Sequence, residues 1–187
     1  MGARQFTHGE RAYQVDRGVF DPVHHLSGLV LADHLSEVLA PVAPAGARIV
    51  DVGTGCGLLA ATAAQAGYHV VATDSSPAAV SCASSNTMDL DVDVRAGDLF
   101  EALAGERFAV MVVNPPYEVG PARPWANATV RSPDFLTRCA AGWATFADHL
   151  VLGFPAEEGD LLVACGFAVD CWRILETEGR PLGIYVG

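Results

Sequence analysis

The sequence predicts a single α/β domain with a Rossmann-like core, in which a mostly parallel, seven-stranded sheet carries helices on both faces. Apolar runs rich in β-branched residues alternate with Ala-rich stretches of helical length, as in parallel sheets whose strands are buried on both faces. A glycine-rich segment follows the first of these runs, where a strand would turn into a helix. The 187 residues, of which 51% are hydrophobic, suit one domain spanning residues 1–187.

Strands are expected at residues 48–52, 69–73, 92–96, 108–113, 149–154, 168–175 and 182–186. Helices are expected at residues 26–39, 57–66, 77–88, 133–147 and 157–165. Ser76 precedes Pro77, and a hydroxyl N-cap followed by proline is typical of a helix start. The last two strands are predicted to form an antiparallel pair at one edge of the sheet. The polar lead and first helix, residues 1–45, are expected to cap a ligand pocket.

The charge balance is strongly acidic. The 22 Asp and Glu residues outnumber 11 basic residues, all of them Arg, for a formal net charge of −11. Such a surface repels polyanions, so free nucleic acid is disfavoured as a partner. The N-terminus lacks the apolar segment of a secretory signal, no stretch reaches the roughly 18 apolar residues of a membrane span, and the cysteines have no C-x-x-C spacing. A cytoplasmic protein without a metal site or membrane partner is therefore expected.

The first candidate site is the segment Asp51–Leu58, at the end of the first strand and the start of a helix. Its glycines, Gly53, Gly55 and Gly57, allow a sharp turn that brings backbone N–H groups against a ligand, and the helix start favours a carboxylate. Thr54 lies inside the same turn. The G-x-G-x-G spacing differs from the G-x-G-x-x-G of dinucleotide sites, which argues against a nicotinamide or flavin oxidoreductase.

Two more acidic residues follow the next strands along the chain. Asp74, with Ser75 after it, closes the second strand, and its carboxylate can accept both hydroxyl hydrogens of a ribose. Asp98 can accept a hydrogen bond from an adenine amino group, while Leu99 can donate its backbone N–H to the ring. Taken alone, Asp74 also fits a helix N-cap and Asp98 a turn. Because the carboxyl ends of parallel strands meet at one crevice, both are expected to converge with Asp51 on one ligand.

The segment Asn114-Pro115-Pro116-Tyr117 directly follows a very apolar strand. Two prolines fix the backbone and remove two N–H donors, which leaves the carbonyl of Pro115 rigidly aimed near the amide oxygen of Asn114. An NH2 group bound by both acceptors would turn its lone pair toward an incoming methyl group. Tyr117 is expected to supply a flat surface for a planar substrate group. The segment therefore predicts methyl transfer to a nitrogen next to a planar, conjugated group.

In this order, DVGTGCG, Asp74, GDL and NPPY resemble the class I S-adenosylmethionine (SAM)-dependent methyltransferases of the N-methylating NPPY branch. The lead Gly18–Pro22, followed by an apolar helix, is similar to that of the compact release-factor glutamine methyltransferases of the HemK/PrmC type. The resemblance covers roughly residues 15–187 and implies a class I methyltransferase fold with SAM as the cofactor.

The resemblance also implies roles for individual residues. Asp51 and the three glycines would surround the methionine part of SAM. Asp74 would bind the ribose, Asp98 and Leu99 the adenine, and residues 114–117 the target nitrogen. Thr54, Ser75 and Asn114 are also expected to contact the cofactor.

Residues outside these motifs are expected to shape the pocket and contact the substrate. Phe20 and Pro22 would form the pocket wall. His25, beside them, and Trp125, in the long irregular segment 116–132, are candidates for substrate contact. A capping role for His25 and a packing role for Trp125 are the alternatives.

Several methyl acceptors fit these motifs. A glutamine-type amide of a protein or peptide suits the acidic surface and the single domain, and a small metabolite or natural product suits them equally if segment 116–132 closes as a lid. Adenine in nucleic acid matches the NPPY motif but not the charge, unless an accessory subunit supplies a basic face. A SAM-binding regulatory subunit without turnover is the alternative outside the enzymes, and the intact residues 114–117 argue against it.

Overall fold

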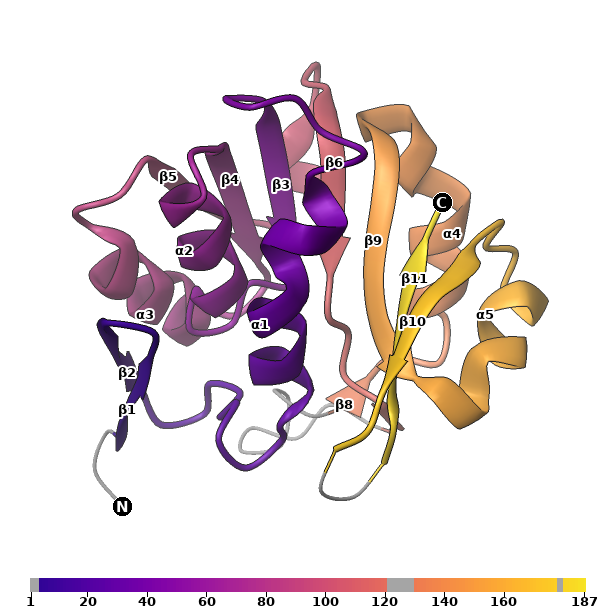
Figure 1. Ribbon diagram of the computed structural model, residues 1–187, viewed down its shortest axis with the longest axis horizontal. Helices are drawn as coiled ribbons and strands as arrows, with labels where there is room; N and C mark the ends of the chain where they lie inside the picture. The colour runs from indigo at the N-terminus through magenta and orange to yellow at the C-terminus, as the bar shows by residue number, and fades with distance from the viewer. Residues whose placement is uncertain (1–3, 121–129, 178–179) are drawn as a thin grey trace.

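The computed structural model describes residues 4–120, 130–177 and 180–187, and its centre is a sheet of seven strands in the order β10-β11-β9-β6-β3-β4-β5 (Figure 1). The strands are Arg48–Val52 (β3), His69–Asp74 (β4), Val92–Ala96 (β5), Phe108–Val113 (β6), Ala147–Pro155 (β9), Asp170–Leu175 (β10) and Leu182–Val186 (β11). All seven predicted strands are therefore present. Strand β9 begins and ends outside the predicted range 149–154, because helix α4 stops directly before it.

Most neighbouring strands of the sheet run parallel. The pairs β3–β4, β3–β6, β4–β5 and β6–β9 are all parallel. Strand β11 runs antiparallel to both of its neighbours, β9 and β10. The predicted antiparallel pair at the sheet edge is confirmed, with β11 inserted between the edge strand and the rest of the sheet.

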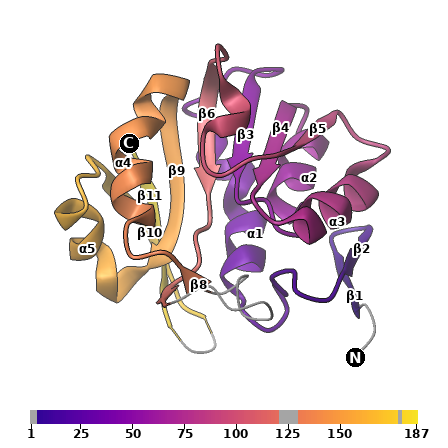
Figure 2. The same cartoon turned by 180° about the vertical axis from the view of Figure 1, so that it is seen from behind.

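Helices cover both faces of the sheet, as predicted. Helices α1 (Ser27–Leu39), α2 (Leu58–Gln65) and α3 (Pro77–Thr87) contribute to one apolar core, while α4 (Phe135–Phe146) and α5 (Gly159–Ala164) contribute to the other. Figure 1 shows α1 and α2 in front of the sheet, and Figure 2 shows α4 in front of it from behind. Two short 3-10 helices follow β5 and β9, at Glu101–Leu103 and Ala156–Glu158. Among the described residues, no helix combines the length and apolarity that crossing a bilayer requires.

The alternation of side chains along the central strands explains the two cores. Ile49 of β3 belongs to the core under α1 and α2, whereas Val50 and Val52 belong to the core under α4. Successive side chains of a strand point to opposite faces, so a strand covered on both sides is apolar at nearly every position. Full burial of one such Val or Ile contributes about 1.5–3 kcal/mol.

The start of α3 follows the predicted capping pattern. Ser76 has extended backbone geometry, and its hydroxyl accepts a hydrogen bond from the backbone N–H of Ala79 at 3.4 Å. Pro77 occupies the first helical turn, where its missing N–H costs nothing. The helix therefore begins close to the end of β4 and brings its N-terminus to the same edge of the sheet.

The N-terminal lead holds a hairpin that the sequence analysis did not predict. Strands β1 (Arg4–His8) and β2 (Arg11–Val15) pair antiparallel around a two-residue turn, in which Gly9 has a φ of 58°. The hairpin is anchored on α3 by Asn86, whose side chain accepts from the N–H of Gln14 and donates to its carbonyl. Residues after the hairpin then run to the edge of the sheet at which β4 and β6 end.

The segment 116–132, expected to be a long irregular loop, contains two short strands. Strand β7 (Glu118–Val119) pairs in parallel with β8 (Val130–Arg131). Trp125, the candidate for substrate contact in this segment, lies outside the described residues.

Replacement of Gly57 tests why this glycine is needed. Its φ is 83°, and an added Cβ would lie 3.2 Å from Ala83 and from Thr87 on α3. Gly46 has a φ of 73° with nothing within 4 Å, so Gly46→Ala carries the conformational cost without the contact. We expect Gly57→Ala to lower the free energy of unfolding by about 1–3 kcal/mol more than Gly46→Ala, measured by urea denaturation. Equal losses would show that the contact with α3 is unimportant.

Candidate active site

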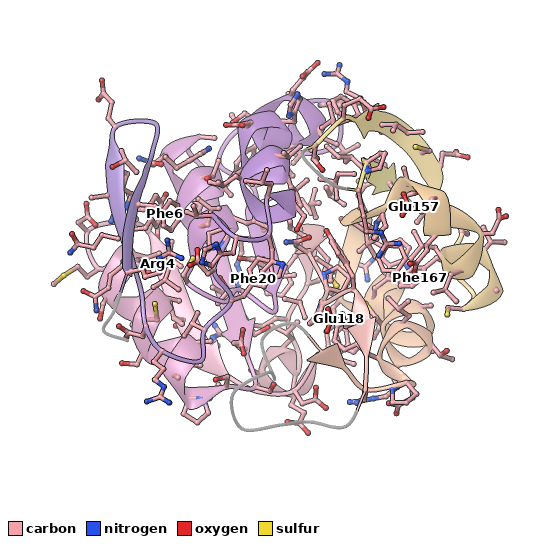
Figure 3. All side chains as sticks on the ribbon, turned by 90° about the horizontal axis from the view of Figure 1, so that it is seen from below. Arg4, Phe6, Phe20, Glu118, Glu157 and Phe167 are labelled. Carbon is pink, nitrogen blue, oxygen red and sulfur yellow. The ribbon has the colours of Figure 1, made fainter. Side chains whose placement is uncertain are left out.

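The parallel registers align the polar ends of the central strands. Val52 of β3 pairs with Thr73 of β4 and with Val113 of β6. The next residue of each strand therefore reaches the same edge of the sheet: Gly53, Asp74 and Asn114. Figure 3 views this edge of the molecule, which is the lower edge in Figure 1.

A cavity of about 580 Å³, the larger cavity, lies at this edge. All four sequence motifs contribute to its wall, together with both residues expected to shape it. The predicted residues that line it are Phe20, Pro22, Gly53, Thr54, Gly55, Asp74, Ser75, Asp98, Leu99, Asn114, Pro115 and Pro116.

The glycine-rich turn is held against the end of β4. The N–H groups of Gly53 and Thr54 both donate to the carbonyl of Thr73, at 2.8 and 3.0 Å. Gly53 and Gly55 have φ values of 77° and 59°, in the left-handed region where a Cβ is disfavoured. A Cβ on Gly53 would meet nothing within 4 Å. The turn therefore leaves open space beside its own backbone, as a ligand that contacts the main chain requires.

Asp51 lies beneath the glycine-rich turn and contacts it through Thr54. Neither Asp51 nor Gly57 is among the residues that line the larger cavity. One carboxylate oxygen of Asp51 accepts a hydrogen bond from the Thr54 hydroxyl at 2.7 Å, and the other has no partner among the described residues. Burial, with a smaller contribution from the charge of Asp74, raises the pKa of Asp51 to about 7, while the bond from Thr54 opposes the rise. Gly57 packs on α3 instead.

The carboxylate of Asp74 is oriented by backbone donors on both sides. One oxygen accepts from the N–H of Gly55 at 3.0 Å, and the other accepts from the N–H of Ser76 at 2.9 Å. Burial raises the pKa of Asp74, and these backbone bonds counteract the rise. Asp74 lines the larger cavity, and a carboxylate held in this way can accept further hydrogen bonds from hydroxyl groups of a ligand there.

The Gly97-Asp98-Leu99 motif contains a strained backbone position and an ion pair. Leu99 is buried and has a φ of 48°, the one positive φ outside glycine among the described residues. Asp98 pairs with Arg138 of α4 at 2.6 Å, with both side chains 43% exposed. Non-glycine residues with positive φ are uncommon and gather at ligand sites. Arg138 also lines the larger cavity.

Pro115 and Pro116 form the diproline corner, which lies between the larger cavity and a smaller one of about 230 Å³. Pro115, Pro116 and Phe20 line both cavities, so the two cavities adjoin at these residues. Asn114 lines only the larger cavity, and Tyr117 lines only the smaller one. A group in the smaller cavity and a group in the larger cavity would meet at this corner.

The wall of the smaller cavity combines aromatic and polar side chains. His25 stacks on Phe20, with ring centroids 5.2 Å apart, and both line the cavity. Glu118, Thr177 and Arg180 also line this cavity. In Figure 3, Phe20 lies near the centre of this end of the molecule, with Glu118 beside it.

Tyr117 contacts other side chains through both its hydroxyl and its ring. Its hydroxyl donates to the side-chain oxygen of Asn114 at 3.0 Å, and its ring packs edge-to-face on Phe154, with centroids 5.7 Å apart. Burial raises the pKa of Tyr117, while hydrogen bonding from Ser27 and the charge of Arg180 lower it. The tyrosine is therefore fixed at both ends.

Sequence reasoning missed several residues that line the larger cavity. Gly18 and Val19 precede Phe20, Gly28 opens α1, and Phe135 and Arg138 come from α4. Gly18 and Val19 belong to the lead Gly18–Pro22, so their position next to Phe20 in the sequence could have identified them. No sequence signal marked Phe135 and Arg138, because their approach to the end of β5 depends on how α4 packs on β6 and β9.

The chain matches the family model of the methyltransferase small domain over residues 26–131, more than half its length. It belongs to this family. The predicted methyltransferase family is thereby confirmed.

Several curated relatives are named release factor glutamine methyltransferase. The protein from Xylella fastidiosa is 40% identical over 155 residues, which cover 80% of this chain and 44% of that protein. The Escherichia coli protein is 38% identical over 88 residues, which cover 44% of this chain and 32% of that protein. The chain thus spans less than half the length of these relatives. A ribosomal protein L11 methyltransferase from Symbiobacterium thermophilum is 35% identical over 102 residues, which cover 52% of this chain and 32% of that protein.

Solved structures confirm the predicted class I methyltransferase fold. A 16S rRNA N2 methyltransferase from T. thermophilus, in complex with AdoMet and guanosine, has a TM-score of 0.68 at 23% identity, covering 99% of this chain and 49% of that chain. The Mtq2-Trm112 complex of E. cuniculi has a TM-score of 0.66 at 16% identity, covering 91% of this chain and 98% of that chain.

Asp51→Asn tests the effect of the buried carboxyl on stability. The pKa of Asp51 in the folded protein, about 7, lies above the ordinary value of 3.8. The neutral form therefore stabilises the fold at low pH, and this contribution is lost as pH rises from about 4 through 7. We expect the wild type to lose up to roughly 4 kcal/mol relative to Asp51→Asn between pH 4 and pH 8, measured by urea denaturation. A pH-independent difference would contradict the raised pKa.

Proposed function

We propose that this chain transfers the methyl group of SAM to the side-chain amide nitrogen of a glutamine in a protein. The observation that carries the proposal is the diproline corner, whose Pro115 and Pro116 line both the larger and the smaller cavity. The larger cavity receives the methyl donor and the smaller one the acceptor.

The larger cavity suits the parts of SAM in order. Asp74, held by Gly55 and Ser76, would accept from the ribose hydroxyls. The side chain of Asp98 and the backbone of Leu99 would bind the adenine. The open backbone of the glycine-rich turn would contact the methionine part. When bound there, SAM supplies a methyl group on a positively charged sulfur.

The chain's own residues would position the acceptor nitrogen. The two prolines restrict the backbone φ angles at this corner, which fixes the direction of the Pro115 carbonyl. Together with the side-chain oxygen of Asn114 it would accept the two hydrogens of an amide NH2 group. Holding the nitrogen in this way directs its lone pair toward the donor, and the two oxygens stabilise the positive charge that develops on nitrogen.

The choice of a protein amide has three supports. Several curated relatives are named release factor glutamine methyltransferase, and the formal net charge of −11 disfavours binding of RNA or DNA. The smaller cavity, of about 230 Å³, opens beside polar groups of Thr177 and Arg180, which suit an uncharged polar side chain.

The direct test is methyl transfer to a purified bacterial translation release factor. The chain is incubated with tritium-labelled SAM and the release factor, and peptide mass spectrometry locates the added methyl group. We expect the label on one glutamine side chain. Label in RNA or a small molecule, or none in the release factor, would overturn the choice of acceptor.

Asn114→Ala separates acceptor positioning from cofactor binding. We expect kcat to fall about 100- to 1,000-fold, because one of the two oxygens that hold the reacting nitrogen is lost. The Kd for SAM, measured by calorimetry, stays within about tenfold. Asp74→Ala is the matched comparison, and it should weaken SAM binding at least tenfold by removing two charge-assisted hydrogen bonds. Normal turnover by Asn114→Ala would refute the assigned role.

A further inference from the structure

The side-chain amide of Asn114 is surrounded by Tyr117, Gly28 and Gly153, which come from three different parts of the fold. The hydroxyl of Tyr117 donates to its oxygen at 3.0 Å. Gly153 of β9 lies on the same side, since a Cβ there would approach this oxygen to 3.2 Å. Gly28 of α1 lies on the other side, since a Cβ there would approach the amide nitrogen to 3.6 Å. The amide thus occupies a slot between two glycines.

The two ends of an asparagine amide have nearly the same shape but opposite hydrogen-bonding character. Its oxygen accepts, and its nitrogen donates. The slot limits the position of the amide but not which end faces a given neighbour. A hydrogen-bond partner has to decide that, and Tyr117 is the side chain that supplies one.

Tyr117 is itself oriented by its surroundings. Its ring packs edge-to-face on Phe154, and its hydroxyl is held at the Asn114 oxygen. Ser27 at the start of α1 lowers the pKa of the phenol, against the larger effect of burial. The hydroxyl hydrogen is directed to the Asn114 oxygen, 3.0 Å away.

We propose that Tyr117 is a positioning residue that, through its hydroxyl group, fixes the Asn114 amide with the oxygen available to the acceptor nitrogen. The proposal rests on the proposed function and adds a specific role for the phenol. An amide oxygen has two lone pairs, so the bond from Tyr117 leaves one for the acceptor. In the reversed orientation, the hydrogens of the Asn114 nitrogen would face the hydrogens of the acceptor NH2 group.

Tyr117→Phe removes the hydroxyl and keeps the ring. If the ring acts only as a stacking surface, this variant is as active as the wild type. We expect kcat toward the release factor to fall about 3- to 10-fold, the loss of one net hydrogen bond. The KM for the release factor and the Kd for SAM stay within about twofold, because the binding surfaces are unchanged.

Tyr13→Phe is the matched control. Tyr13 is 1% exposed, its hydroxyl has no hydrogen-bond partner among the described residues, and it packs on Phe6 of the N-terminal hairpin. Loss of the Tyr13 hydroxyl should leave kcat and the KM for the release factor unchanged. A similar drop in kcat for both variants would overturn the proposal, since it would trace the effect to loss of a buried hydroxyl in general.

A second readout does not depend on the acceptor. The side-chain NH2 resonances of Asn114 are identified in a ¹⁵N-labelled protein by their absence in Asn114→Ala. We expect them to shift in Tyr117→Phe and not in Tyr13→Phe. Unmoved resonances overturn the proposal, even if kcat falls. If the wild type methylates no glutamine, the proposed function fails, while shifted resonances still support the orienting role of Tyr117.

Discussion

The site depends on the parallel register of β4, β3 and β6. Pairing of Val52 with both Thr73 and Val113 brings the three strands to the same level. The glycine-rich turn, the Asp74 carboxylate and the diproline corner follow at that level, so three segments far apart in sequence meet without any long loop. A shift of one residue in either pairing would turn every side chain of that strand to the other core. The burial of both faces therefore fixes the site as well as the sheet.

Polar groups at this edge are satisfied mostly by the backbone. The carbonyl of Thr73 receives two N–H groups of the turn, and the two oxygens of Asp74 receive one N–H from the turn and one from the start of α3. These bonds make β4 the element to which both the turn and the following helix are tied. The cost of burying Asp51 beneath the turn is limited because its carboxyl can stay neutral up to a pH of about 7.

The sheet and most of the cavity wall were predictable from sequence because they follow from local patterns. Strands buried on both faces leave continuous apolar runs, and the Ser76-Pro77 pair marks a helix start that the structure confirms. The hairpin before residue 16 was missed although Gly9 lies between two runs in which Phe6 and Tyr13 alternate with polar residues. Such a hairpin is stabilised by packing on α3 rather than by its own sequence.

Contacts between distant elements were not predictable. The pairing of Asp98 with Arg138 depends on where α4 begins, and the hydrogen bond from Tyr117 to Asn114 depends on the slot between Gly28 and Gly153. The Asn-Pro-Pro-Tyr segment indicated two converging acceptors and a flat ring. It held no information on how the ring would lie, because Phe154 and Ser27 come from other parts of the fold.

The central claim is that the diproline corner separates a donor cavity from an acceptor cavity. The most direct measurement is a crystal structure of the chain with S-adenosylhomocysteine and a glutamine-containing peptide of a release factor. We expect the ribose on Asp74, the sulfur beside Pro115, and the glutamine amide entering past His25 and Tyr117. A ligand whose sulfur lies away from residues 114–117, or a peptide amide reaching it from another side, would contradict the claim.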